Sequence, residues 1–323
     1  MCTAVTYQTK DHYFGRNLDL EYIYDEHVVI TPRQYPLPFR CEEPQHTHLA
    51  MIGMATVAQG YPLYYEATNE CGISGAGLNF PDNAHYLPVD ESKRNIAPFE
   101  LIPWVLGQCK SVADVRRLLM RTNIAKVQFN QEFPLTPLHW IFSDKSGSVT
   151  VEPGQSGIKI YDNPVGILTN NPSFDYHMHN LCNYMNLTCE EARNRFCKDF
   201  DIKAYSRGMG AFGLPGDLSS ASRFVKAAFT KLNSVSGKTE EESISQFFHI
   251  LNAVAQQRGC VRIGDAFEIT AYSSCCNTDK GIFYYTTYEN SQITAVRLHG
   301  VELDQEELYV FPLVKEQQIR FVN

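Results

Sequence analysis

The first candidate for chemistry is the second residue of the chain, Cys2. A thiol attacks as the thiolate, so it needs a base or a lowered pKa. Removal of Met1 would give Cys2 a free α-amine, whose ordinary pKa of about 7.7–8.0 suits a general base. The start Met1-Cys2 therefore suggests a nucleophile and a base on one residue. Many chains begin Met-Cys by chance, so other residues must decide between the two interpretations.

Arg16 and Asp19 lie in the run FGRNLD, which follows a turn at Lys10-Asp11. A hairpin at this turn would bring the run beside Cys2. An arginine near a thiol favours the thiolate, and a carboxylate near an ammonium group holds and orients it. The alternative is that both side chains face solvent, which is the commoner position for these residue types.

Asn79 in GLNFP and Asn170 in LTNNP each end a β-like run. Asparagine side chains and nearby backbone N–H groups are suitable donors for an oxyanion hole. Taken singly, an asparagine at the end of a strand is more often a turn residue.

Two further motifs suggest cofactors but lack the necessary context. The glycines of Gly208–Gly213 fit GxGxxG, yet polar residues precede them and Pro215 follows, so the strand and helix of a dinucleotide site are missing. His177 and His179 would share a face only in a strand, and no third ligand with recognisable spacing is near. We therefore expect a glycine-rich loop, surface or loop histidines, and neither a metal nor an organic cofactor.

The composition excludes several classes of function. The chain has 323 residues, of which 44% are hydrophobic and 20% charged, as in globular proteins. A net charge of −8 and the lack of a basic run argue against nucleic-acid binding. No stretch of about 18 apolar residues is present, so no membrane insertion is expected. Ten cysteines without a recognisable signal peptide indicate reduced thiols in a cytoplasmic protein.

The elements that must position these residues alternate between groups of strands and pairs of helices. Helical patterns occupy 98–109, 111–122, 221–235 and 240–259. Strand-like runs occupy 2–10, 13–20, 26–35, 51–57, 61–68, 137–144, 148–153, 157–162, 165–170, 265–275, 281–290, 292–298 and 307–313. This order predicts an α+β fold of antiparallel sheets with outer helix pairs, in a single domain spanning residues 1–323. The last four runs are predicted to form consecutive antiparallel hairpins.

Capping signatures support two of the helices. Ser111 is followed three residues later by Asp114, and Thr239 is followed three residues later by Glu242. Such pairs satisfy free backbone N–H groups at a helix N-terminus. We therefore expect one helix to begin at Ser111 and another at Thr239.

Five motifs in order, MCT, FGRNLD, GLNFP, LTNNP and SASRF, resemble the choloylglycine hydrolase family. This family comprises bile salt hydrolases and penicillin V acylases, which are N-terminal-nucleophile hydrolases. The likeness extends over essentially the whole chain and includes PLHWIFSD, GLPGD, FFHILN and YYTTYEN. Each motif is weak alone, but five in order are specific.

The resemblance implies a four-layer αββα sandwich in which Met1 is removed and the Cys2 α-amine acts as proton shuttle. The positions that match the family's catalytic residues are Cys2, Arg16, Asp19, Asn79, Asn170 and Arg223. In this correspondence the two asparagines stabilise the oxyanion, and Arg223 is a second active-site arginine. The doublet Asn170-Asn171 leaves an ambiguity of one residue, and Asn170, directly after Thr169, is preferred.

The implied reaction is hydrolysis of the amide bond in glycine- or taurine-conjugated bile acids, through a thioester on Cys2 and without a cofactor. Asn79 favours this substrate, because penicillin acylases of the family tend to carry tyrosine there. The alternatives are a penicillin V acylase, another N-acyl amide hydrolase or an acyltransferase of the same fold. A non-catalytic bile-acid-binding protein is a further alternative, and it requires that Met1 be retained or Cys2 be inert.

Residues for substrate binding are suggested by position. Leu18, Tyr64 and Phe133 are apolar residues that could line a steroid-sized groove, although ordinary packing explains them equally well. Arg207 lies in the glycine-rich loop and is predicted to favour the sulfonate of taurine, because a guanidinium fork matches it. The resemblance also implies a homotetramer in the cytoplasm of gut-associated bacteria.

Overall fold

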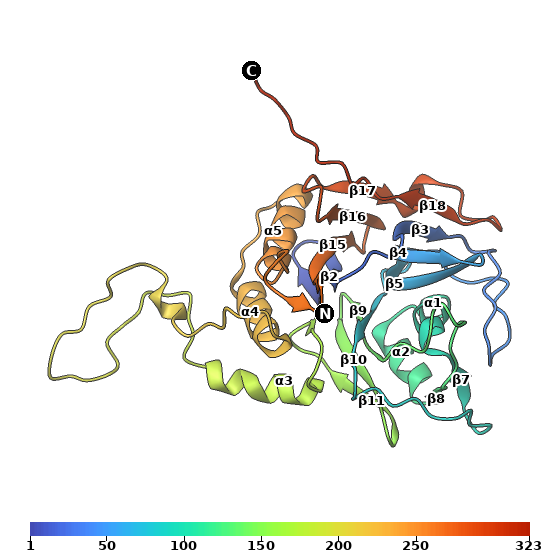
Figure 1. Cartoon of the computed structure of the whole chain (residues 1–323), viewed down its shortest axis with the longest axis horizontal. Coiled ribbons are helices and arrows are strands. Elements are labelled where there is room, and N and C mark those ends of the chain that lie inside the picture. Colours follow the sequence, from blue (N-terminus) through green and yellow to red (C-terminus); the bar gives the residue numbers. More distant parts are fainter.

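The computed structural model describes residues 1–323 and consists of two antiparallel sheets that face each other, with helices on both outer faces (Figure 1). The predicted α+β sandwich is therefore confirmed. The six-stranded sheet has the order β12-β1-β2-β15-β16-β17, and the eight-stranded sheet has the order β11-β10-β9-β6-β5-β4-β3-β18.

The six-stranded sheet carries the N-terminus of the chain. Its strands are β1 (Cys2–Gln8), β2 (His12–Leu20), β12 (Ile167–Leu168), β15 (Ile269–Asn277), β16 (Ile282–Thr287) and β17 (Thr294–Arg297). All neighbouring pairs are antiparallel. β1 and β2 form the hairpin that the turn near residue 10 predicts.

The eight-stranded sheet is formed mainly by the first half of the chain. Its strands are β3 (His27–Thr31), β4 (Met51–Ala58), β5 (Tyr61–Asn69), β6 (Ser74–Asn79), β9 (Leu138–Asp144), β10 (Gly147–Gly154), β11 (Gly157–Asp162) and β18 (Tyr309–Pro312). Two short pairs lie outside both sheets: β7 (Arg94–Ile96) with β8 (Thr122–Ile124), and β13 (Arg262–Ile263) with β14 (Ala266–Phe267).

The predicted C-terminal hairpins are correct for β15, β16 and β17 but wrong for β18. This last strand pairs with β3 in the eight-stranded sheet. Its partner lies far away in sequence, so the alternation of residues 307–313 carried no information about which sheet the strand joins.

Each sheet is covered by one pair of helices. α1 (Leu101–Leu106) and α2 (Val112–Leu119) pack on the eight-stranded sheet, while α4 (Ser220–Asn233) and α5 (Glu240–Asn252) pack on the six-stranded sheet. Short 3₁₀ turns are η1 (Pro98–Glu100), η2 (Leu181–Tyr184), η3 (Met209–Ala211) and η4 (Leu298–Gly300). No helix is long and apolar enough to cross a membrane.

The two predicted caps are confirmed. The Ser111 side chain accepts a hydrogen bond from the Asp114 N–H at 3.1 Å, which satisfies a free donor at the start of α2. Thr239 and Glu242 form a reciprocal capping box at the start of α5.

The histidine pair near residue 178 lies neither in a strand nor in a loop. It belongs to the helix α3 (Phe174–Asn180), where His177 is buried and His179 is exposed. The expectation of surface histidines is therefore wrong for His177. Residues two apart on a helix do not share a face.

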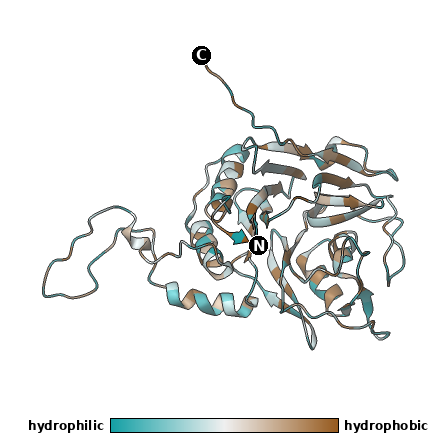
Figure 2. Cartoon of the chain, in the orientation of Figure 1, coloured by the Kyte–Doolittle hydropathy of each residue, from teal (hydrophilic) through white to brown (hydrophobic).

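Two hydrophobic cores result from this layering, and the more apolar strand residues gather along them (Figure 2). The first core fills the space between the sheets and under α4 and α5, and it includes Cys2 and Leu18. The second core lies between the eight-stranded sheet and α1 and α2, and it includes Trp104 and Trp140. Each fully buried large side chain contributes about 1.5–3 kcal/mol to folding.

Residues 185–219, here called the projecting loop, extend away from the sandwich (Figure 1). Apart from η3 they form no regular structure, as the sequence predicts for most of this region. The GxGxxG motif lies in this loop, and neither a strand nor an α-helix adjoins it. The C-terminal tail, residues 315–323, is also exposed and points away from the body.

Candidate active site

The β1–β2 hairpin places Cys2 in the first core, where 3% of its surface is exposed. In the register of this hairpin Cys2 lies opposite Leu18, and Ala4 lies opposite Arg16. Side chains that lie opposite each other in an antiparallel pair share a face, and successive residues alternate. The Cys2 thiol therefore lies on the same face as Leu18 and Arg16.

Arg16 shows that this face looks toward the eight-stranded sheet. Its Nη1 donates hydrogen bonds to the carbonyl oxygens of Gly77, at 2.7 Å, and Tyr65, at 3.1 Å. Its Nε lies 3.8 Å from the Glu66 carboxylate, and both side chains are fully buried. Burial works against the charge of Arg16, but neighbouring anionic groups, with Cys2 foremost, raise its pKa. The cation is therefore well placed to stabilise a thiolate at Cys2.

Glu66 in turn accepts hydrogen bonds from Tyr272, at 2.7 Å, and Ser274, at 2.8 Å. Burial raises the pKa of Glu66 to about 7, with Arg16 acting in the opposite direction. Strands β2, β5 and β15 are thus tied together by one polar cluster directly beneath the nucleophile.

Asp19 and Arg223 meet on the opposite face of the six-stranded sheet, beneath α4. One Asp19 oxygen accepts a hydrogen bond from Thr270 at 2.6 Å. The other lies 3.9 Å from Arg223 Nη1 and accepts no hydrogen bond. Burial raises the pKa of Asp19, and the Arg223 charge opposes that rise. Both side chains are almost fully buried and out of reach of water. The positive charge of Arg223 and the negative charge of Asp19 therefore compensate each other.

Asn170 joins these groups to the nucleophile. Its Oδ1 accepts hydrogen bonds from the Cys2 N–H at 2.8 Å and from Arg223 Nη2 at 2.9 Å. Its Nδ2 donates to the carbonyl oxygen of Asn79 at 2.7 Å. Arg223 also donates to the Cys2 carbonyl and, at 2.6 Å, to Thr3 Oγ1. The structure thus brings Cys2, Arg223, Asn170 and the backbone of Asn79 together.

The two asparagines differ in what their side-chain amides contact. Asn170 Nδ2 is engaged by a carbonyl within the chain. The Asn79 side chain is exposed and makes no hydrogen bond within the chain. Asn171 donates to the Pro81 carbonyl at 2.6 Å and does not contact Cys2. Of the doublet, it is therefore Asn170 that the structure brings to Cys2.

Glu268 was not identified from the sequence. With Met1 in place, the N-terminal ammonium group contacts the Glu268 carboxylate and donates to the Asp19 carbonyl at 2.6 Å. Burial lowers the pKa of this ammonium group, while Cys2 and Asp19 oppose the change. Glu268 lies just before β15 and 267 residues from Met1, so no local pattern links the two.

The predicted substrate-binding residues are not gathered in one place. Leu18 lies beside Cys2, as described above. Tyr64 instead belongs to the second core, where its hydroxyl group bonds Thr31 at 2.7 Å. Phe133 also packs at that core, 6.1 Å from the ring of Phe129. Arg207 is exposed on the projecting loop. The structure therefore does not bring Tyr64, Phe133 or Arg207 to Cys2.

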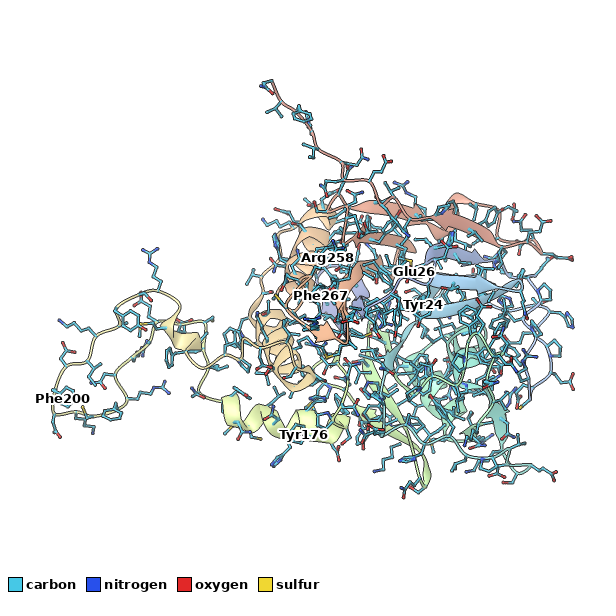
Figure 3. All side chains as sticks on the ribbon, in the orientation of Figure 1. Tyr24, Glu26, Tyr176, Phe200, Arg258 and Phe267 are labelled. Carbon is cyan, nitrogen blue, oxygen red and sulfur yellow. The ribbon has the colours of Figure 1, made fainter.

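A cavity of about 400 Å³ lies at the C-terminal end of β2, beyond Leu18. Leu20 and Ile269 lie opposite each other in the register of β2 and β15, and Leu20 shares the face of Leu18. Arg258 and Phe267, labelled in Figure 3, are among the residues that line this cavity. The lining residues are Leu20, Glu21, Tyr22, Ile23, Arg258, Phe267, Ile269 and Glu289. This largely apolar lining was missed because its members come from four places along the chain: 20–23, 258, 267–269 and 289.

No group of three or more His, Cys, Asp or Glu side chains is arranged to hold a metal ion. Around Cys2 the chain provides a thiol, an arginine on the same face and an amide oxygen at the backbone nitrogen.

Comparison with known proteins identifies the family of this chain. A family model for linear amide C–N hydrolases, choloylglycine hydrolase family, matches residues 2–311. The chain therefore belongs to this family, and it is an enzyme of the class that hydrolyses linear amide C–N bonds.

Full-length relatives lie within the same family. A bile salt hydrolase/transferase of Lactiplantibacillus plantarum is 53% identical over 100% of both chains, and one of Clostridium perfringens is 37% identical over 100% of both. The crystal structure of the C2A mutant of conjugated bile acid hydrolase from Clostridium perfringens superposes with a TM-score of 0.92, at 37% identity over 100% of both chains.

A more distant structure shares the fold alone. Penicillin V acylase from Agrobacterium tumefaciens superposes with a TM-score of 0.77, at 17% identity, over 97% of this chain and 92% of that one. At this identity the likeness confirms the sandwich architecture and says nothing about the substrate.

Proposed function

We propose that this enzyme hydrolyses the amide bond of glycine- or taurine-conjugated bile acids. The observation that carries the proposal is the hydrogen-bonded set around Cys2, in which Asn170 and Arg223 contact its backbone and Arg16 lies on the face of its thiol. The full-length 53% identity to a protein named bile salt hydrolase/transferase supports this substrate class.

The reaction begins after removal of Met1, when the nitrogen of Cys2 becomes an α-amine. This nitrogen lies 2.8 Å from Asn170 Oδ1, which keeps it in place as an acceptor of protons. The amine takes the thiol proton, and the thiolate, stabilised by Arg16, attacks the amide carbonyl. The tetrahedral intermediate collapses when the ammonium group gives its proton to the departing nitrogen of glycine or taurine.

A thioester then joins the bile acid to Cys2. Water attacks this thioester and transfers a proton to the α-amine, which returns it to the thiolate as the free bile acid leaves. The products are one bile acid and one amino acid or taurine, and the enzyme returns to its starting state.

The two asparagines are proposed to act differently, although the sequence suggested the same role for both. Asn79 has a free side-chain amide and is our candidate donor to the oxyanion. Asn170 has its amide nitrogen engaged by Asn79 and its oxygen directed at the Cys2 nitrogen. We therefore assign Asn170 to holding the α-amine rather than to donating to the oxyanion.

Asp19 and Arg223 are proposed to complete the site. The unpartnered Asp19 oxygen is an acceptor available on the side of the N-terminus, and Arg223 balances its charge at 3.9 Å. Leu18 is the residue proposed to contact the acyl group beside Cys2, and Arg207 remains the proposed partner of the taurine sulfonate.

We further propose that the chain forms one domain and assembles as a homotetramer in the bacterial cytoplasm. Both sheets contribute to a shared core, and all ten cysteines are free. The projecting loop exposes apolar side chains that association would bury: Met185, Phe196, Phe200, Tyr205 and Phe212. Light scattering on wild type and a Phe200→Ser variant tests the assembly, and a monomeric wild type would contradict it.

The activity is tested by measuring release of glycine and taurine from a panel of conjugates. Wild type should hydrolyse conjugates of both, Cys2→Ser should be nearly inactive because serine is a weaker nucleophile, and intact mass should show loss of Met1. A chain that retains Met1 and releases neither product would contradict the proposal.

Acyl transfer is tested in the same reaction mixture. If a free amine intercepts the thioester, mass spectrometry will detect a new conjugate when bile acid conjugates are incubated with other amino acids. The relatives from Lactiplantibacillus plantarum and Clostridium perfringens are named bile salt hydrolase/transferase, which motivates this second measurement.

A further inference from the structure

Two buried imidazole rings lie behind Asn170, and the mechanism above uses neither. His139, on β9, contacts the carbonyl oxygen of Thr169 through Nε2 at 2.9 Å. His177, on α3, contacts the carbonyl oxygen of Asn170 through Nε2 at 2.9 Å. Neither ring is exposed to solvent. Consecutive carbonyl groups of the segment that carries Asn170 are therefore each held by a separate imidazole N–H.

The rings themselves are fixed by stacking. His139 stacks on Phe80 with a centroid distance of 4.1 Å and an interplanar angle of 6°. His177 stacks on Phe224 with a centroid distance of 4.7 Å and an interplanar angle of 16°. Phe80 follows Asn79, and Phe224 follows Arg223, so each ring packs against the neighbour of a site residue.

Glu152 links the two rings to one another. Its Oε1 lies 3.3 Å from His139 Nδ1 and accepts the backbone N–H of Phe174, the first residue of α3, at 2.8 Å. The carboxylate therefore positions His139 directly and the helix that carries His177 indirectly. All three polar side chains are buried.

The hydrogen-bond pattern also shows which nitrogen of each ring carries a proton and donates it. His139 Nε2 faces the carbonyl oxygen of Thr169, which can only accept, so this nitrogen carries a proton and donates. Burial lowers the pKa of His177, and its Nδ1 has no partner. His177 therefore donates from Nε2 as the neutral tautomer.

The same peptide segment is also held through its N–H and a side chain. Ser220, at the start of α4, accepts the Asn170 N–H at 2.8 Å and donates to Thr169 Oγ1 at 3.0 Å. With both carbonyls and this N–H engaged, the backbone at Thr169–Asn170 has little freedom to rotate.

We propose that His139 and His177 are positioning residues that fix the backbone of Thr169–Asn170, so that the Asn170 side chain meets the nitrogen of Cys2. Neither ring touches the reacting atoms. The inference rests on the proposed function, because it concerns the role assigned there to Asn170. A shift of about 1 Å in a positioning group can cost about 100-fold in rate.

Paired substitutions separate this role from simple packing. His139→Gln and His177→Gln place an amide near the former Nε2 and can keep the carbonyl contact. His139→Asn and His177→Asn place the amide near the former Nδ1 and lose it. The control is His48, a buried histidine whose nitrogens contact the carbonyls of Leu49 and Tyr35, both at 2.8 Å.

The first measurement is kcat and KM for hydrolysis of a taurine conjugate. The rates are expressed per active site, as counted by active-site titration. The Asn variants of His139 and His177 should lower kcat about 10- to 100-fold with KM changed less than about twofold. The Gln variants should recover most of kcat, and His48→Asn should leave it unchanged. Equal kcat in Gln and Asn variants, or kcat per titrated site equal to wild type, would overturn the inference. If an Asn variant does not fold, the Leu variant, closer in volume, replaces it.

The second measurement needs no bile acid. Alkylation of the N-terminal Cys2 peptide by iodoacetamide at pH 7 should be slower in the Asn variants than in the Gln variants and wild type. If conjugates are not hydrolysed but alkylation follows this order, the proposed substrate fails while the positioning role stands. If conjugates are hydrolysed and alkylation is the same in all variants, the positioning role fails alone.

Discussion

The surroundings of Cys2 and the projecting loop are opposite in almost every physical respect. Around Cys2, charged and amide side chains from β2, α4 and the segment that follows β12 are buried and joined by short hydrogen bonds. In the projecting loop, Phe196 is 86% exposed, and Phe200, at its far end in Figure 3, is 60% exposed.

The difference separates two requirements of the proposed reaction. Proton transfer at Cys2 needs donors and acceptors held to within fractions of an ångström, which buried hydrogen bonds provide. Recognition of different conjugates needs only a surface segment whose side chains can change without disturbing the fold. Substitutions near Cys2 should therefore alter chemistry and stability together, and substitutions in the loop should alter selectivity or assembly.

Arg223→Met is expected to have the largest effect. It leaves the Asp19 carboxylate buried without its cation, so the free energy of unfolding should fall by about 3–5 kcal/mol in urea denaturation. The matched control is Arg258→Met, which removes an ion pair whose partners are 58% and 42% exposed and should change stability by less than about 1 kcal/mol. An equal loss in the free energy of unfolding for the two variants would mean that burial of an ion pair does not determine how much it stabilises this protein.

Asn170→Ala should lower kcat about 100-fold, because the nitrogen of Cys2 loses the acceptor that positions it. Asn171→Ala, which removes only the contact with Pro81, should stay within about twofold of wild type. Steady-state hydrolysis of a glycine conjugate measures both. A larger loss of kcat for Asn171→Ala than for Asn170→Ala would assign the role of holding the Cys2 nitrogen to Asn171 instead.

Glu66→Gln should change the pH dependence of stability. The Glu66 pKa is about 7 in the folded chain against an ordinary value of 4.5, so the folded state binds this proton more tightly than the unfolded state. The bound proton therefore stabilises the folded wild type at low pH, and this stabilisation is lost as pH rises from 4.5 to 7. Glutamine does not titrate, so the variant should gain about 2 kcal/mol relative to wild type across this interval.

This difference is measured by urea denaturation of both proteins at several pH values. Using the difference cancels the contributions of other titrating groups, such as Glu100 and His12. A constant difference over the interval would show that Glu66 is ionised in the folded chain throughout.

Arg207→Ala is expected to have the smallest effect on the protein itself. Its side chain is exposed and forms no hydrogen bond or ion pair within the chain, so the thermal midpoint should not change. We expect kcat/KM for taurine conjugates to fall about 5- to 10-fold relative to glycine conjugates, because the sulfonate loses a charge-assisted partner. An unchanged ratio would remove Arg207 from substrate recognition.

Features governed by nearby residues were predictable from the sequence. The caps at Ser111 and Thr239 depend on residues three positions away, and the β1–β2 hairpin depends on a short turn. The grouping of strands and helix pairs was enough to predict the sandwich fold, and the motifs were enough to identify the family. These signals are local or depend on order along the chain, which a sequence displays directly.

Features governed by distant partners were not predictable. β18 joins the sheet of β3, and Glu268 meets the N-terminus, across intervals that no local pattern spans. Tyr64 was misplaced for a different reason. The register of β4 and β5 shifts between Met54 and Ala55 and skips Tyr65, so Tyr64 and Ala67, three residues apart, both belong to the second core. An irregular strand of this kind cannot be assigned by counting alternate residues.

The two ends of the chain differ in how much room surrounds them. The N-terminal ammonium group is enclosed by Asp19 and Glu268, whereas the tail beyond residue 315 is exposed and leads away from the body (Figure 1). An affinity tag or a surface linkage placed before Cys2 would have to displace these contacts. The same attachment at Asn323 would leave them intact, so immobilised or fused forms of this enzyme should be joined through their C-terminus.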